Sequence, residues 1–120
     1  MPLRNIAQTL MHLGRNDEAI TAYREALAAD PTFAIGYVNL ALCLSRAQKH
    51  DEAVATLAAF TRTVPETAEN AYYRGYIAQQ LNLTEQARQA YRRALELDPS
   101  RKTRNRRSRR WVVPDNDDAR

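Results

Sequence analysis

Few side chains in this sequence could do chemistry. The chain has two histidines, His12 and His50, and one cysteine, Cys43. A zinc site needs several nitrogen, sulfur or carboxylate ligands at close spacing, and a catalytic triad needs a nucleophile beside its histidine. The sequence offers neither grouping, and with three glycines it has no glycine-rich phosphate loop. We therefore expect no enzyme activity, no metal and no cofactor.

The remaining reactive groups have simpler interpretations. Cys43 lies in the apolar stretch 38–44, so we expect a small packed residue without a redox role. Glu18, Glu52 and Glu85 stand where helices are expected to begin. A carboxylate there stabilises the positive end of the helix dipole, which is reason enough for its presence.

The clearest chemical signal is a run of cations near the C-terminus. It is followed by an aromatic side chain, and its members are Arg101, Lys102, Arg104, Arg106, Arg107, Arg109, Arg110 and Trp111. Such a run repels itself, so we expect a disordered tail at 101–120. It could grip phosphates while Trp111 stacks on a base, or bind an anionic membrane surface. Alternatively, the tail is only solvated, docks its Trp-Val-Val on the last helix, or is foreign to the folded body.

The net charge of +4 belongs to this tail alone. Residues 1–100 carry 10 basic and 11 acidic side chains, whereas residues 101–120 carry 8 basic and 3 acidic ones. Any interaction with nucleic acid or another polyanion is therefore expected to depend on the tail and not on the body.

The body repeats with a period of 34 residues. Proline marks the end of each unit at Pro31, Pro65 and Pro99. Three further columns agree at the same spacing: Ala19, Ala53 and Ala87; Tyr23, Leu57 and Tyr91; Ala7, Ala41 and Gly75. Each unit shows two apolar patterns of helical period separated by a short polar turn, and the proline ends the second pattern. The sequence thus predicts three helical hairpins, at about 1–33, 34–67 and 68–100.

This pattern resembles the tetratricopeptide repeat. The second unit shows the resemblance best, and its matching residues are Tyr37, Leu40, Ala41, Leu44, Ala53, Leu57, Phe60 and Pro65. The resemblance implies an all-α fold in which three antiparallel helix-turn-helix hairpins stack as a right-handed superhelix, an α-solenoid of six helices. About three such units are needed for stability. In the third unit, Ala71, Arg74 and Ala78 replace large apolar residues, so we expect looser packing of its first helix.

The last helix is an incomplete end cap. Arg88 replaces the apolar Ile20 and Val54 of the earlier units, but Leu95 and Leu97 remain apolar. Three explanations stay open: the tail covers them, the protein self-associates through this helix, or the chain is part of a longer repeat array.

The resemblance also implies a partner-binding groove. First helices line the concave side of the superhelix in this family, and their outward stripe contacts the partner. In this chain that stripe is Arg4, Asn5, Gln8, His12, Val38, Asn39, Leu42, Arg46, Tyr72, Tyr73, Tyr76 and Gln80. Tyr72 and Tyr76 share a helix face, and tyrosine combines a rigid apolar body with a polar tip.

A carboxylate clamp, found in chaperone-adaptor members of the family, is matched poorly. Arg4 and Asn39 agree with it, but Gln8 replaces an asparagine, and Glu69 and Tyr73 replace basic residues. A ligand with an apolar or aromatic anchor suits the stripe better.

We therefore expect a non-catalytic scaffold that binds a protein or peptide segment in the concave groove. Nucleic acid or polyanion binding through the tail is the alternative, as is a fragment of a larger enzyme or secretion-related protein. No apolar run is long enough to span a membrane, and the start lacks a signal-peptide core, so a cytoplasmic location is expected.

Overall fold

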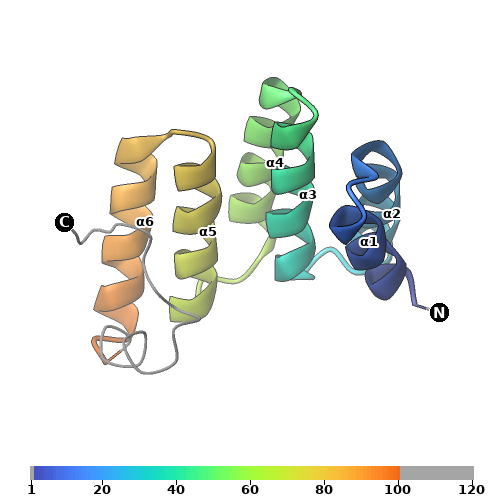
Figure 1. Cartoon of the computed structure of the whole chain (residues 1–120). Helices are drawn as coiled ribbons and strands as arrows, with labels where there is room; N and C mark the ends of the chain where they lie inside the picture. The colour runs from blue at the N-terminus through green and yellow to red at the C-terminus, as the bar shows by residue number, and fades with distance from the viewer. Residues whose placement is uncertain (1, 101–120) are drawn as a thin grey trace.

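Six helices in three antiparallel pairs make up the computed structural model, which describes residues 2–100 (Figure 1). The pairs lie in a row, with the first and third hairpins at its two ends. The helices are α1 (Leu3–His12), α2 (Asn16–Ala29), α3 (Ala34–Arg46), α4 (His50–Thr63), α5 (Ala68–Gln80) and α6 (Thr84–Leu97). The described residues contain no strand. The predicted all-α stack of three hairpins is confirmed.

One turn geometry closes all three hairpins. Gly14, Gln48 and Asn82 are 34 residues apart, and each has a positive φ, of 78°, 66° and 63°. The next residue donates its N–H back to the first helix, as Lys49 does to the Leu44 oxygen at 2.8 Å. Such a left-handed residue after a helix satisfies carbonyls that the helix leaves without partners. The repeat in sequence is therefore also a repeat in backbone conformation.

The connections between hairpins are held by short local hydrogen bonds. The Asp30 carboxylate accepts from the backbone N–H and the hydroxyl of Thr32, at 3.1 and 2.9 Å. At the second connection, the Thr67 hydroxyl accepts from the N–H of Asn70 at 3.1 Å and so caps α5. Proline ends the preceding helix, and these side chains set the direction of the next one.

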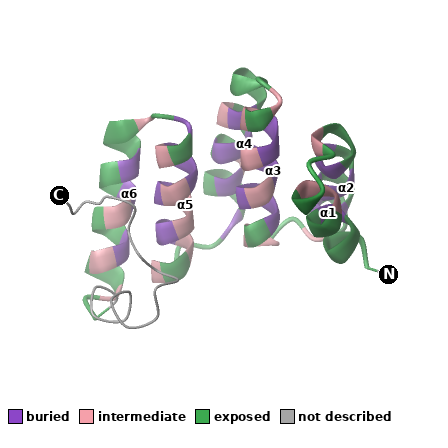
Figure 2. Ribbon diagram, viewed as in Figure 1, coloured by how far each residue is buried: buried purple, intermediate pink, exposed green. Residues whose placement is uncertain are grey.

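Buried residues lie along all six helices, both within the hairpins and between them (Figure 2). The main core runs through all three hairpins, and a small second cluster joins the outer ends of α5 and α6. Tyr37 and Phe60 meet edge to face within the main core, with ring centroids 5.7 Å apart. Cys43 is fully buried there, which confirms the packed thiol, and burial raises its pKa.

The expected looseness of α5 is wrong for its contact with α6. Ala71 and Ala78 are both 0% exposed, and a Cβ added to Gly75 would lie 2.8 Å from the Tyr91 ring. Small residues in α5 let α6 approach closely, so the two helices form the most extensive helix pair of the described chain. The shorter distance between the two helices removes the space that larger side chains would otherwise have filled.

The two ends of the stack are only partly covered. On α6, Arg88 is exposed, Leu95 is half-buried and Leu97 is 40% exposed. On α1, Leu3 and Ile6 are 37% and 36% exposed. Among the described residues, none of the helices has the length and apolar character needed to cross a membrane.

The left-handed turns generate a first prediction. Gln48 has a Cβ that clashes in this conformation, whereas glycine does not. Gln48→Gly should raise the free energy of unfolding by about 0.5 to 1 kcal/mol, measured by urea denaturation. Gly14→Ala, the opposite change at the equivalent turn, should lower it by about 1 kcal/mol. Equal stabilities for all three proteins would contradict the turn assignment.

Candidate partner-binding site

The first helices of the hairpins form one continuous side of the stack, because α3 packs against α5 and also contacts α1. Within this side, Leu42, Tyr73 and Tyr76 are half-buried and pack against the main core. Arg46 and Gln80 beside them are exposed. We call these five residues of α3 and α5 the tyrosine surface. It offers apolar bodies with a polar border, an arrangement common at protein-binding surfaces.

The Tyr73 side chain of this surface is held by contacts within α5. The Tyr73 hydroxyl donates to the Glu69 carboxylate at 3.0 Å, one turn earlier on α5. Its ring meets the Tyr72 ring at a centroid distance of 6.1 Å. The orientation of Tyr73 is thus fixed by its own helix, which lowers the conformational entropy that a partner would have to remove.

Two predicted groove residues are core residues instead. Val38 and Tyr72 are each 6% exposed. The Tyr72 ring packs against Tyr91 of α6, with centroids 5.6 Å apart, so it cannot contact a partner while the hairpin is closed. The sequence showed that Tyr72 and Tyr76 share a helix face, but not that the small residues of α5 bring Tyr91 onto it.

The predicted basic position at the start of the stripe is occupied by internal contacts. Arg4 bonds to Asp30 at 2.5 Å, and its guanidinium lies 3.9 Å from the centre of the Phe33 ring. The pKa of Asp30 is lowered, mainly by the hydrogen bonds from Thr32 and further by Arg4. Arg4 therefore secures the connection after α2, which is a role that sequence reasoning missed.

A carboxylate clamp is not assembled. The Asn39 amide is half-buried and donates to the Tyr23 hydroxyl at 2.9 Å, while Arg4 is bound to Asp30. The remaining α1 members of the stripe, Asn5, Gln8 and His12, are exposed. They form a polar extension of the first-helix side beyond the tyrosine surface.

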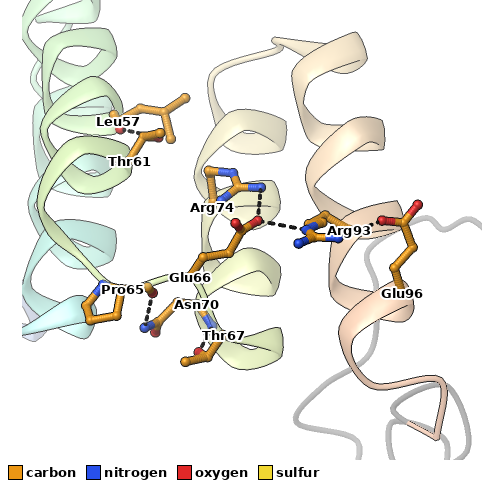
Figure 3. A network of polar contacts seen from close by, with 9 residues as sticks. All are labelled: Leu57, Thr61, Pro65, Glu66, Thr67, Asn70, Arg74, Arg93 and Glu96. Carbon is orange, nitrogen blue, oxygen red and sulfur yellow. Dashed lines mark hydrogen bonds and ion pairs between the residues drawn. The ribbon is translucent and has the colours of Figure 1, made fainter.

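A charged network joins the connection between α4 and α5 to both helices of the third hairpin (Figure 3). The Glu66 carboxylate accepts from Arg93 of α6 at 3.0 Å and lies 3.8 Å from Arg74 of α5. Arg93 also donates to Glu96 at 3.1 Å. The network gives Arg74, which stands in an otherwise apolar column, a charged partner. The acid Glu66, just after Pro65, was the sequence signal for this contact.

The predicted polyanion-binding residues lie outside the described residues: Arg101, Lys102, Arg104, Arg106, Arg107, Arg109, Arg110 and Trp111. In the part of the chain that is described, no group of three or more His, Cys, Asp and Glu side chains could hold a metal ion.

The repeated hairpins, the common turn and the continuous first-helix side define an α-solenoid of helical hairpins. Residues 10–79 match one sequence profile of the tetratricopeptide repeat, and residues 68–101 match a second. The chain belongs to the tetratricopeptide repeat family. Such repeats generally mediate protein–protein interaction and are typically non-catalytic modules. A search of curated proteins found no match to this chain.

The charged network generates a second prediction. Glu66→Gln keeps the shape of the side chain but removes the charge that two guanidinium groups share. We expect the thermal midpoint to fall by about 2 °C at low salt and by less at high salt. Glu85→Gln is the matched control, since among the described residues Glu85 pairs within α6, with Arg88. Equal shifts for the two variants would show that the network adds no more stability than an ion pair within one helix.

Proposed function

We propose that this chain binds a segment of a partner protein on the tyrosine surface of α3 and α5. The observation that carries the proposal is the position of Tyr73 and Tyr76, which are half-buried on the core yet still reach solvent. Tyrosines anchored in this way lose little entropy on binding and offer large apolar area with a polar tip.

The chemistry of the surface narrows the partner. Leu42 and Tyr76 favour an apolar or aromatic anchor, and the exposed cation of Arg46 favours an acidic side chain near it. Gln80 can both donate and accept hydrogen bonds, so it suits an extended backbone or a helix end. The proposed ligand is therefore a short segment with one apolar anchor and a neighbouring acid.

The cellular location of the chain and its attachment to a larger protein are part of the same proposal. A cytoplasmic location agrees with the single buried thiol of Cys43. Attachment to a larger enzyme or to secretion machinery would make the chain the recognition module of that assembly, with the same surface in use.

Substitution at the tyrosine surface tests the proposal. Peptides would be selected on the full chain from a displayed random library and measured by calorimetry. Tyr76→Ala should weaken the selected peptides about tenfold or more, because a partly buried aromatic anchor is lost. Gln80→Ala, at an exposed position, should weaken them several-fold.

Gln89→Ala, which is exposed on α6, is the control and should bind as the parent does. Circular dichroism would show that each variant keeps its helices. Peptides that bind Tyr76→Ala and Gln80→Ala as tightly as the parent would place the site elsewhere.

A second function, polyanion binding, is favoured by the distribution of charge. The body has a net charge of −1, while residues 101–110 hold seven cations in ten positions. A polyanion would be attracted to these cations, with Trp111 adding contact to a base.

This function predicts a steep response to salt. A labelled single-stranded DNA should bind the full chain about a thousandfold more weakly at about 200 mM salt than at about 50 mM, because several counterions are released on binding. Binding should vanish when residues 101–120 are deleted. Fluorescence anisotropy measures both effects, and an affinity that hardly changes with salt would remove this function.

A further inference from the structure

The contact between the first and second hairpins, here called the first junction, uses two specific polar pairs. The Tyr23 hydroxyl of α2 accepts from the Asn39 amide of α3 at 2.9 Å. Arg24 of α2 pairs with Glu52 of α4 at 2.6 Å. Each pair joins a second helix to the hairpin that follows it.

The contact between the second and third hairpins cannot form these pairs. One repeat further along, Leu57 and Tyr73 occupy the positions of Tyr23 and Asn39. Ala58 and Gln86 similarly replace the ion pair of Arg24 with Glu52. Near this junction, Glu66 of the connection between α4 and α5 pairs with Arg74 and Arg93 of the third hairpin.

The two ends of the stack, however, carry the residue types that form the polar pairs of the first junction. Two repeats beyond Tyr23 and Arg24 lie Tyr91 and Arg92 on α6. One repeat before Asn39 and Glu52 lie Asn5 on α1 and Glu18 on α2. Both pairs are therefore complete only between the last hairpin of one chain and the first hairpin of another.

The apolar residues at the ends follow the same register. Leu3 and Ile6 of α1 are 37% and 36% exposed, whereas the equivalent Tyr37 and Leu40 of α3 are 7% and 5% exposed. On α6, Leu95 is half-buried where the equivalent Leu27 is 9% exposed. A further hairpin packed on either end would cover these apolar residues, as the first junction covers their equivalents.

The polar side chains at the ends have the donors and acceptors that these contacts need. The Tyr91 hydroxyl donates to Gln79 at 2.8 Å, and a hydroxyl that donates can also accept from an amide. Glu18 is exposed and pairs with Arg15, while its counterpart Glu52 binds Arg24 with Lys49 nearby. Pro2 replaces Gly36, which approaches Leu27 closely, so Leu95 must take a different rotamer there.

We propose that copies of this chain stack head to tail, with α6 of one copy packed on α1 of the next. The contact reproduces the first junction, with Tyr91 bonded to Asn5 and Arg92 paired with Glu18 of the neighbouring copy. Because the two surfaces differ, the contact is heterologous, and repetition of the superhelical step leaves the assembly open.

Sedimentation velocity on the full chain tests the stacking. The weight-average mass should rise above the 13.7 kDa of one chain as concentration increases from about 1 μM to about 1 mM, without levelling off at a dimer. Arg92→Glu and Glu18→Arg each place like charges at the contact, so each should weaken association about tenfold. An equimolar mixture of the two variants should restore it, since every contact between unlike variants joins opposite charges.

Arg62→Glu is the matched control, with the same charge change at an exposed position of α4, and should assemble as the parent does. A parent chain that stays at 13.7 kDa throughout would overturn the proposal. So would an assembly that stops at two copies, or a mixture that associates no better than either variant alone. Peptide binding to the tyrosine surface is measured separately and does not depend on this result.

Discussion

The structure depends on one constraint, which is that a two-helix hairpin cannot bury both of its apolar sides by itself. The helices show this directly. α3 has hairpins on both sides and buries seven residues, whereas α1, at the end of the row, buries only Ala7. Much of the burial in the middle of the row is therefore produced at the junctions between hairpins. The packing at each junction decides how firmly neighbouring hairpins are held together, and the ends keep apolar residues that a further hairpin could cover.

The two internal junctions satisfy this constraint differently. At the first, α2 packs extensively on α3, and the Tyr23–Asn39 and Arg24–Glu52 pairs add direction. At the second, α4 contacts α5 less extensively, and a charged network ties the connection between these helices to α6. Close packing of Gly75 on Tyr91 makes the third hairpin compact in itself. The third hairpin is thus well packed internally, while its second-helix contact with the preceding hairpin is less extensive than the one at the first junction.

How much the sequence could predict follows from the range of each interaction. The prolines and the turn at Gly14 determine the backbone within a few residues, and the period repeats them along the chain. The hairpins and their ends could therefore be derived from the chain alone. The side chains of Tyr72 and Arg4 could not be placed, because their partners Tyr91 and Asp30 are 19 and 26 residues away. Helical spacing gives the face of a residue but not which neighbour covers that face. The small column containing Gly75 indicates that two helices approach closely, but spacing does not reveal that the Tyr91 ring is what meets the glycine.

The proposed binding surface and the proposed stacking contact lie on different helices. Leu42, Tyr76 and Gln80 lie on the first-helix side, whereas Arg92 and Glu18 belong to the ends of the row. Stacking would then leave the tyrosine surface open and place a second copy of it at a fixed distance along the superhelix. A partner segment long enough to contact two copies binds the stacked form better than the single chain, so it also stabilises the stack. Reciprocally, stacking raises the affinity for such a segment by the same factor, which couples partner length to assembly in a chain of only three repeats.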